Sequence, residues 1–310
     1  MKKRIRIKFI DGWKGWVKED YHFYNLLSSM YDLELVDKNP DYVFSIGVGF
    51  GDTDFLYPDA VKIVYIGENR TPDFNRFDYA IGFDHLSFGD RYLRYPLYLT
   101  YSACGKIVSG AALTDSQLLD RKFCSFVVSN RHGDDFRCEF FERLSKYRRV
   151  DSGGRVLNNI GGRIGDKHEF CSQYKFNIAF ENSVYPGYTT EKPVEALAAN
   201  SVPIYYGDPL VAAGINPEAM VIVRSREDME RAIEEIIRLD NDDAAYLKKC
   251  RTPKLALDPA AEERKARAFL ANIFDPPPAE AKRLARFGSQ ANYRRDLGRV
   301  YSSFLYRLFK

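Results

Sequence analysis

The stretch from 176 to 207, FNIAFENSVYPGYTTEKPVEALAANSVPIYYG, decides the fold class of this chain. It opens with an apolar run, Phe176–Phe180, and closes with a second one, Val202–Tyr206. Between them, Glu191–Ala199 has the apolar spacing of a helix, with Thr190 placed to cap its first turn and Pro193 tolerated inside that turn. A strand, a helix and a second strand in this order predict a parallel βαβ unit.

The same alternation continues on both sides of this stretch. It predicts strands and helices at 5–10, 21–31, 33–36, 42–48, 61–66, 79–81, 123–129, 135–147, 220–223 and 227–239. The small and polar residues at 101–121 predict a linker between two series of alternating strands and helices. A chain of 310 residues suits two domains, so we expect two doubly wound α/β domains with a ligand cleft at the carboxyl ends of their strands.

Composition narrows the class of protein. With 45% hydrophobic and 29% charged residues the chain is globular, and no apolar run approaches the roughly 18 residues of a membrane span. Residues 1–10 alternate basic and apolar side chains, which indicates a strand and argues against a signal peptide. Five Cys without CxxC spacing argue against a disulfide framework or a Cys-rich zinc site, so we expect a reducing cytoplasm.

The net charge of +3 is unevenly distributed. Residues 279–310, which follow Pro276–Pro278, contain eight Lys and Arg against two acids, so this tail carries +6 and the rest of the chain −3. On a helix, apolar and basic residues of the tail separate onto opposite faces: Leu297, Tyr301, Phe304 and Leu308 against Arg295, Arg299 and Lys310. This pattern is typical of an amphipathic helix at an anionic membrane surface. Docking of the helix onto the protein stays open, and stacking of its aromatics on nucleic acid is the less favoured alternative.

Three charged residues stand at predicted strand–helix junctions. Lys192 and Arg137 each lie in the first turn of a helix, where a cation opposes the helix dipole unless an anion binds there. Two such cations in one domain suit a diphosphate, although each alone could be a solvated or ion-paired surface residue, Arg137 with Asp134 or Glu139. Glu68 directly follows the strand at 61–66 and is placed to act as a general base, with a simple turn residue as the alternative.

Other chemistry finds less support. Asp73, Asp78, Asp84 and Asp90 are rivals of Glu68, but more of them occupy turn and cap positions. Asp52 and Asp54 have the spacing of a metal-binding pair, but no His or third acid lies nearby, and the four His show no ligand spacing. The Gly-rich loop at 153–165 lacks both GxGxxG and a Walker motif, so it indicates no dinucleotide or ATP site.

Several motifs together resemble glycosyltransferase family ten, the α-1,3/4-fucosyltransferases, and especially its bacterial members. They lie at 67–69, 77–84, 91–97, 125–130 with Arg137, 176–183, 188–192 and 202–207. The resemblance covers about 60–275 and, more weakly, the first 60 residues. Two departures are Asn200, where Gly is common, and Pro193, where an aliphatic residue is common.

The resemblance implies a GT-B fold of two Rossmann-like domains facing each other across a cleft. It implies an acceptor domain at 1–120, a GDP-fucose domain at 121–278 and the basic amphipathic tail at 279–310. The implied reaction is inverting transfer of L-fucose from GDP-fucose to a hydroxyl, O3 of GlcNAc or Glc in a lactosamine-type or surface glycan such as lipopolysaccharide. By the same resemblance Glu68 is the catalytic base, Arg137 and Lys192 hold the diphosphate, and Asn182, Tyr188 and Glu191 contact the nucleotide sugar.

The remaining expectations concern cofactors and partners. A helix N-terminus with an Arg and a Lys can take up the charge of departing GDP, so we expect no metal requirement and at most modest stimulation by a divalent ion. We expect an oligosaccharide or lipid-linked glycan as acceptor, no nucleic-acid partner, and a cytoplasmic enzyme peripherally bound to the inner face of the membrane. The alternative function is a GT-B glycosyltransferase that uses another nucleotide sugar; the motifs favour fucose.

Overall fold

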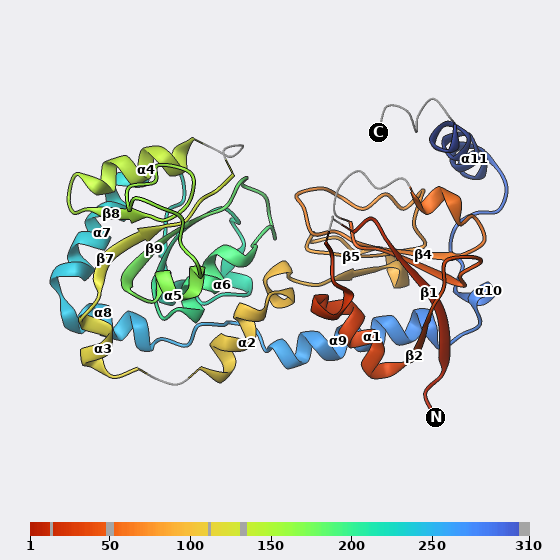
Figure 1. The fold of residues 1–310 in the computed structure, drawn as a ribbon, viewed down its shortest axis with the longest axis horizontal. Helices are drawn as coiled ribbons and strands as arrows, with labels where there is room; N and C mark the ends of the chain where they lie inside the picture. The colour runs from red at the N-terminus through yellow and green to blue at the C-terminus, as the bar shows by residue number, and fades with distance from the viewer. Residues whose placement is uncertain (13–14, 48–52, 111–112, 131–134, 304–310) are drawn as a thin grey trace. The chain divides into compact units, whose positions relative to one another are not determined.

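The computed structural model describes residues 1–310 except 13–14, 48–52, 111–112, 131–134 and 304–310, with the side chains of 301–302 also left undescribed. The chain forms two compact units, one made of residues 1–95 together with 259–310 and the other of residues 96–258. Each unit is built on its own parallel sheet with helices on its faces (Figure 1). The predicted α/β class is therefore confirmed.

The first unit holds a six-stranded parallel sheet in the order β2-β1-β3-β4-β5-β6. Its strands are β1 (Arg4–Ile10), β2 (Asp32–Leu35), β3 (Tyr42–Ser45), β4 (Val61–Tyr65), β5 (Tyr79–Gly82) and β6 (Tyr92–Arg94). β3, β4 and β5 are buried along their whole length, as their apolar sequence dictates for strands covered on both faces. Helix α1 (His22–Met30) buries Phe23, Leu26 and Leu27. Short 3₁₀ turns occur in this unit at Lys18–Asp20, η2 (Thr53–Leu56) and Gly89–Arg91. A further one, Leu97–Thr100, lies at the start of the second unit.

The second unit holds a five-stranded parallel sheet in the order β11-β10-β9-β7-β8. Its strands are β7 (Lys122–Phe126), β8 (Val150–Ser152), β9 (Tyr174–Phe180), β10 (Val202–Tyr206) and β11 (Val221–Ile222). Its helices are α2 (Ser102–Ser109), α3 (Asp115–Leu119), α4 (Phe136–Ser145), α5 (Lys167–Cys171), α6 (Glu191–Ala198), α7 (Met229–Asn241) and α8 (Asp243–Arg251), with 3₁₀ turns at Val211–Ala213 and Pro217–Ala219. β9, α6 and β10 form the βαβ unit predicted from 176–207.

The segment expected to be a linker is structured. Residues 101–121 contain α2 and α3, and α3 begins with a capping box in which Thr114 and Gln117 satisfy each other's backbone N–H groups. Ala103 and Cys104 are buried on α2, which packs against α6 in the second unit. The expected linker therefore belongs to the second unit, because the few apolar residues among its polar ones are buried when its helices pack there.

The unit boundaries differ from the expected ones at 120 and 278, because helix α9 (Pro259–Phe274) packs in the first unit. Phe274 stacks against Tyr42 of β3 with ring centroids 4.6 Å apart, and Tyr31 donates a hydrogen bond to Asp275 at 2.8 Å. Lys3 Nζ donates to the carbonyl oxygens of Phe274 and Asp275, each at 2.8 Å. A helical pattern in the sequence shows that a helix has a buried face but not which sheet covers that face.

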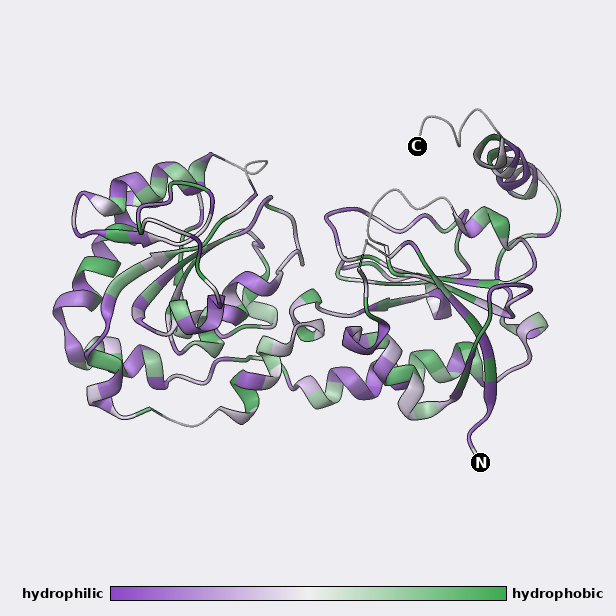
Figure 2. Cartoon of the chain, in the orientation of Figure 1, coloured by the Kyte–Doolittle hydropathy of each residue, from purple (hydrophilic) through white to green (hydrophobic). Residues whose placement is uncertain are grey.

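The basic tail also belongs to the first unit. It contains α10 (Pro278–Ala281) and α11 (Ser289–Ser302), and α11 packs against η2, where Gly298 faces Phe55. Most of α11 has hydrophilic colouring in Figure 2. The docking alternative thus describes α11 as far as Ser302, while Phe304, Leu308 and Lys310 of the expected apolar and basic faces lie outside the described residues. None of the described helices is long and apolar enough to cross a bilayer.

Asn200 shows why one departure from the family pattern is tolerated. This residue follows α6 and has a φ of 53°, in the left-handed region. Glycine adopts this conformation without steric cost, and asparagine is among the few other residues that adopt it readily. The Asn200 carbonyl oxygen also accepts a hydrogen bond of 2.8 Å from Arg121, which anchors the turn.

Candidate functional site

A buried ion pair lies at the carboxyl end of β9 in the second unit. Glu181, the first residue after the strand, is 1% exposed and its carboxylate lies 2.9 Å from Lys192 Nζ in the first turn of α6. The same carboxylate accepts hydrogen bonds from the Thr190 backbone N–H at 2.8 Å and from the Thr190 hydroxyl at 2.7 Å. The βαβ connection therefore brings the end of β9 and the start of α6 together around one carboxylate.

Lys192 is not the solvated cap residue of the alternative interpretation. Its side chain is 16% exposed and lies 3.5 Å from Glu191 as well as 2.9 Å from Glu181. Burial acts to lower the pKa of Lys192, but the attraction of these two carboxylates outweighs burial and raises the pKa above its ordinary value. Lys192 is therefore a fixed cation at neutral pH, held at the N-terminal end of a helix.

Thr190 occupies the N-cap position as predicted, but its side chain does not cap the helix. The hydroxyl donates to Glu181 and accepts a hydrogen bond of 3.0 Å from Lys192 Nζ. Pro193, in the first turn, has no N–H to satisfy and is buried. Because Thr190 is used to hold Glu181 and Lys192, the N-terminal end of α6 keeps its positive dipole character without a capping side chain.

Arg137 is buried rather than paired at the surface. It is the second residue of α4 and is 3% exposed. Its guanidinium donates to the Asn182 side-chain oxygen at 3.2 Å and to the Asn130 carbonyl oxygen. Of the two surface partners considered, Glu139 pairs instead with Arg226, and Asp134 lies outside the described residues. The alternative interpretation of a surface ion pair with Glu139 is therefore wrong, and a buried guanidinium stands at the carboxyl edge of β7 and β9.

The other residues expected at the nucleotide sugar flank this pair of cations. Asn182 is half-buried and holds Arg137, whereas Glu191 is half-buried and ion-paired with Lys192. Tyr188 is buried, 4% exposed, in the loop between β9 and α6. The structure thus brings Arg137, Asn182, Lys192 and Glu191 to one edge of the second sheet.

Two buried carboxylates were not among the expected site residues. Besides Glu181, Asp208 follows β10 and accepts hydrogen bonds from the Gly187 N–H at 2.7 Å and the Thr189 hydroxyl at 2.8 Å. Asp208 therefore fixes the loop that carries Tyr188 and leads into α6. Each of these acids lies within two residues of the end of an apolar strand, as Glu68 does. The rule that ligands bind at the carboxyl ends of parallel strands could therefore have singled them out from the sequence.

Gly207 is required by the position of Glu181. A Cβ atom at residue 207 would lie 2.4 Å from Glu181 Cγ, far inside van der Waals contact. The Glu181 side chain cannot yield easily, because it is buried and held by Thr190 and Lys192. The glycine at the end of the 202–207 motif therefore leaves the space that the buried carboxylate occupies.

Glu68 lies where the sequence placed it, in the first unit. It is exposed in the turn directly after the buried central strand β4, and a hydrogen bond of 2.7 Å from the Arg70 N–H to its carbonyl oxygen closes that turn. The end of β3 approaches this turn closely: Gly47 has a φ of 66°, and a Cβ there would lie 1.8 Å from the Tyr65 carbonyl oxygen. Glu68 thus has the exposure and the rigid support that a general base needs.

Three of its four rivals have structural partners, whereas Asp84 is 5% exposed and its Oδ2 atom has no hydrogen-bond partner among the described residues. Asp78 is buried and accepts hydrogen bonds from the backbone N–H groups of Lys62, Arg283 and Leu284, at 2.7–2.9 Å. Asp90 pairs with Arg283 at 2.6 Å, and Asp73 caps the turn at Asn75. Asp54, one member of the acidic pair considered for a metal, is fully buried between Lys62 and Arg76, while Asp52 lies outside the described residues.

Two parallel α/β units with buried cations at the carboxyl edge of the second sheet define the GT-B class of glycosyltransferases. The "Alpha-(1,3)-fucosyltransferase FucT N-terminal domain" model matches residues 7–101, and the "Glycosyltransferase family 10 (fucosyltransferase) C-term" model matches residues 119–251. The chain belongs to glycosyltransferase family 10, in agreement with the resemblance found from its motifs.

The similarity of the chain to known proteins agrees with its assignment to this family. The chain is 36% identical to the alpha-(1,3)-fucosyltransferase FucT of Helicobacter pylori over 72% of this chain and 54% of that protein, so it spans about half of that relative's length. It is 32% identical to a crystal structure of an alpha1,3-fucosyltransferase, which it matches over 89% of this chain and 91% of the other with a TM-score of 0.76. A crystal structure of an alpha1,3-fucosyltransferase with GDP-fucose is 29% identical over 87% and 91% of the two chains, with a TM-score of 0.71.

Proposed function

We propose that this chain transfers L-fucose from GDP-fucose to a hydroxyl group of a glycan acceptor. The observation that carries the proposal is the pair of buried cations, Arg137 and Lys192, at the carboxyl edge of the second sheet beside the N-terminal end of α6. A diphosphate is the anion that two fixed cations and a helix N-terminus suit best. Relatives whose solved structures are described as complexes with GDP and with GDP-fucose support this donor.

The charge balance at this edge assigns different tasks to the two cations. Glu181 and Glu191 offset the charge of Lys192, whereas Arg137 has no carboxylate partner among the residues that the structure describes. Arg137 and the dipole of α6 therefore supply the surplus positive potential that attracts the diphosphate. Lys192, fixed by two carboxylates, supplies a directed hydrogen-bond donor at a set position.

The proposed reaction is a single displacement at C1 of fucose. Glu68 takes the proton of the acceptor hydroxyl, the acceptor oxygen forms a bond to C1, and the bond between C1 and the β-phosphate oxygen breaks. The bonding electrons leave with GDP, and attack from the face opposite the leaving group inverts the configuration at C1. Arg137 and Lys192 stabilise the charge that grows on GDP, and fixed donors aimed at such charge contribute about 3–4 kcal/mol each.

The proposed acceptor position is O3 of GlcNAc or Glc in a lactosamine-type or surface glycan such as lipopolysaccharide. The test offers labelled GDP-fucose, and in parallel other labelled nucleotide sugars, to a panel of lactosamine-type acceptors and analyses the linkage of each product. We expect fucose alone to be transferred, to O3. Transfer of another sugar would replace this function with the alternative glycosyltransferase, and an O4 linkage would correct the regiochemistry.

We propose that the reaction needs no metal, because the cations and the helix dipole already take up the charge of the leaving diphosphate. Product formation should persist in excess EDTA, and an added divalent ion should stimulate it at most modestly. Complete loss in EDTA, restored by one divalent ion, would contradict this proposal.

We further propose that the tail holds the enzyme at the inner, cytoplasmic face of the membrane. Phe287, Tyr293 and Val300 are exposed beside the basic residues of the tail, an arrangement that suits an anionic interface. Deletion of 289–310 should release the protein from anionic vesicles. The deletion starts at 289 because Tyr79 donates to the Ala281 carbonyl oxygen at 2.7 Å and residues 283–284 bind Asp78, so a longer deletion would damage the first unit. Full-length protein that ignores such vesicles at low salt contradicts membrane association.

A further inference from the structure

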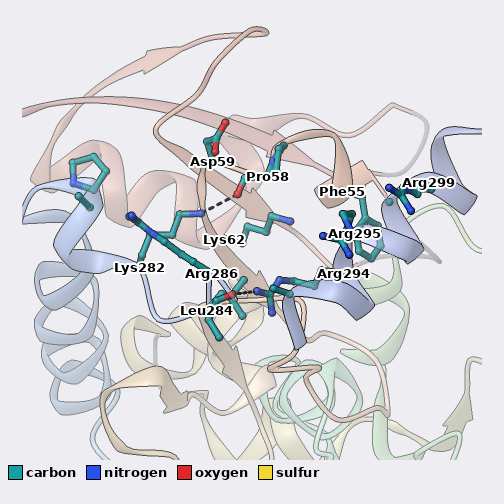
Figure 3. Close-up of a pocket in the computed structure, with 15 residues that line it drawn as sticks. Phe55, Pro58, Asp59, Lys62, Lys282, Leu284, Arg286, Arg294, Arg295 and Arg299 are labelled. Carbon is teal, nitrogen blue, oxygen red and sulfur yellow. Dashed lines mark hydrogen bonds between the residues drawn. The ribbon is translucent and has the colours of Figure 1, made fainter. Parts of the chain in front are cut away.

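A basic pocket lies within the first unit, between η2, β4 and the C-terminal segment. It has a volume of about 840 Å³, within the range of small-ligand sites. Six cations line it: Lys62, Lys282, Arg286, Arg294, Arg295 and Arg299. Figure 3 shows that they come from three directions, from β4, from segment 282–286 and from α11. The only carboxylate in the lining is that of Asp59, which is exposed.

The charges in this pocket are not balanced. Lys62 and Arg76 both pair with Asp54. Arg299 pairs with Asp296 at 3.4 Å. Within the described part of the chain, the other four have no carboxylate partner within ion-pair distance. Lys282 and Arg294 donate to backbone carbonyl oxygens, and Arg295 donates to the Asn292 side chain.

Desolvation makes the charges of the two lysines in this pocket costly. Burial lowers the pKa of Lys282; Asp78 and Asp59 counteract that shift, and Arg286 and Arg294 add to it. Burial also lowers the pKa of Lys62, and Lys282 contributes to the lowering. Bringing so many like charges together is unfavourable unless an anion offsets them. Some of these cations lie on α11 and others on β4 and segment 282–286, so an anion there would also hold α11 in place.

We propose that this pocket binds a small ligand bearing a phosphate group with more than one negative charge. Guanidinium forks converging from different elements suit a phosphate, which accepts several hydrogen bonds at once. Extended nucleic acid suits the pocket less well because its described lining residues offer no open stacking platform. Phe55 is the only aromatic residue among them, and Gly298 and the Arg76 guanidinium, 4.7 Å from the ring centroid, already cover Phe55. The site is distinct from Arg137 and Lys192, which lie in the other unit.

The test titrates tripolyphosphate into the full chain by calorimetry in the absence of GDP, and the variants below separate binding in this pocket from binding beside Arg137 and Lys192. Arg286→Gln/Arg295→Gln removes two charges without affecting any buried ion pair, and should weaken binding by about tenfold or more, the scale of lost charge-assisted hydrogen bonds. Lys38→Gln/Lys248→Gln, an equal charge change at exposed residues outside the pocket, should bind as the parent does. Parent protein that binds no tripolyphosphate, or equal losses in both variants, would overturn the proposal.

Two further measurements locate the site and identify the source of the phosphate. Tripolyphosphate should slow hydrogen exchange in α11 of the parent and not of Arg286→Gln/Arg295→Gln; unchanged exchange in the parent contradicts the proposal. Vesicles of phosphatidylcholine with phosphatidic acid are then added to the tripolyphosphate complex. Displacement of tripolyphosphate supports a lipid headgroup, and its retention supports a soluble phosphate compound. Binding of a single-stranded oligonucleotide that depends on Arg286 and Arg295, without binding of tripolyphosphate, would refute the site as described.

Discussion

Replacing Lys192 with alanine should affect stability and donor binding through two separate effects. The substitution removes the ammonium group 2.9 Å from the carboxylate of Glu181, which is 1% exposed. At an effective dielectric constant of 20, two charges at this distance attract by about 6 kcal/mol, and breaking a buried pair costs about 3–5 kcal/mol in practice. The Thr190 hydrogen bonds remain, and the 16% exposure of Lys192 marks a path for water to Glu181. We therefore expect a loss near the lower end, about 3 kcal/mol.

The second effect concerns GDP. Loss of a charge-assisted hydrogen bond to the diphosphate should weaken GDP binding by about 1.5–3 kcal/mol. The double variant Glu181→Gln/Lys192→Ala separates the two effects, because it removes the unpaired buried charge without restoring a donor for phosphate. Its stability should recover most of the loss, whereas its affinity for GDP should remain low.

Urea unfolding of the second unit and calorimetry with GDP measure the two quantities on the parent, both variants and the control Lys248→Ala. Lys248 is exposed on α8 in the same unit, so its loss should change neither quantity. The reasoning fails if Lys192→Ala unfolds at the same urea concentration as the parent. The assignment of Lys192 to the diphosphate fails if the double variant binds GDP as tightly as the parent.

Three other predictions follow from the site and the first unit. Glu68→Gln should lower the turnover rate by about 10²–10⁴-fold and leave GDP affinity unchanged; near-normal turnover would remove Glu68 as the base. Gly207→Ala should displace Glu181 and weaken GDP binding, whereas Gly165→Ala, where a Cβ meets open space, should not; equal behaviour in a GDP titration would contradict the close approach. Burial lowers the pKa of His22, although Glu263 opposes the shift, so the folded state resists the proton that the unfolded state takes up below about pH 6.5. The contribution of His22 to the stability of the first unit should therefore be complete above that pH and decline as the pH falls towards the folded pKa. In urea unfolding at several pH values, His22→Gln should remove this dependence of stability on pH.

The sequence was most informative where a local pattern has one structural solution. The run at 176–207 gave β9, α6 and β10 almost to the residue, because the chain between two buried parallel strands must cross over as a helix. Lys192 and Arg137 were singled out because a cation in a first helical turn opposes the helix dipole. The motifs added Asn182, Tyr188 and Glu191, which structural rules alone would not have singled out.

The unit boundary, the structure of 101–121 and the burial of Arg137 depend on tertiary packing, which the sequence alone did not reveal. Nothing in the stripe of α9 specifies which sheet covers Leu270 and Phe274, so the unit boundary could not be placed at 258. The polar composition of 101–121 concealed α3, although its Thr114–Gln117 capping box is a recognisable start signal. Arg137 was placed correctly, but its burial depends on Asn182 and Asn130, partners that only the fold brings to it.

The return of α9 to the first sheet makes the second unit an insertion within the first. Residues 96–258 form one continuous segment, whereas the first unit needs both ends of the chain. During synthesis, the second unit can complete its sheet while Tyr31 and Tyr42 still await Phe274 and Asp275. Residues after 258 therefore close the first unit when they emerge from the ribosome, and a stop codon before 259 would spare the unit that carries Arg137 and Lys192 while leaving the unit that carries Glu68 open.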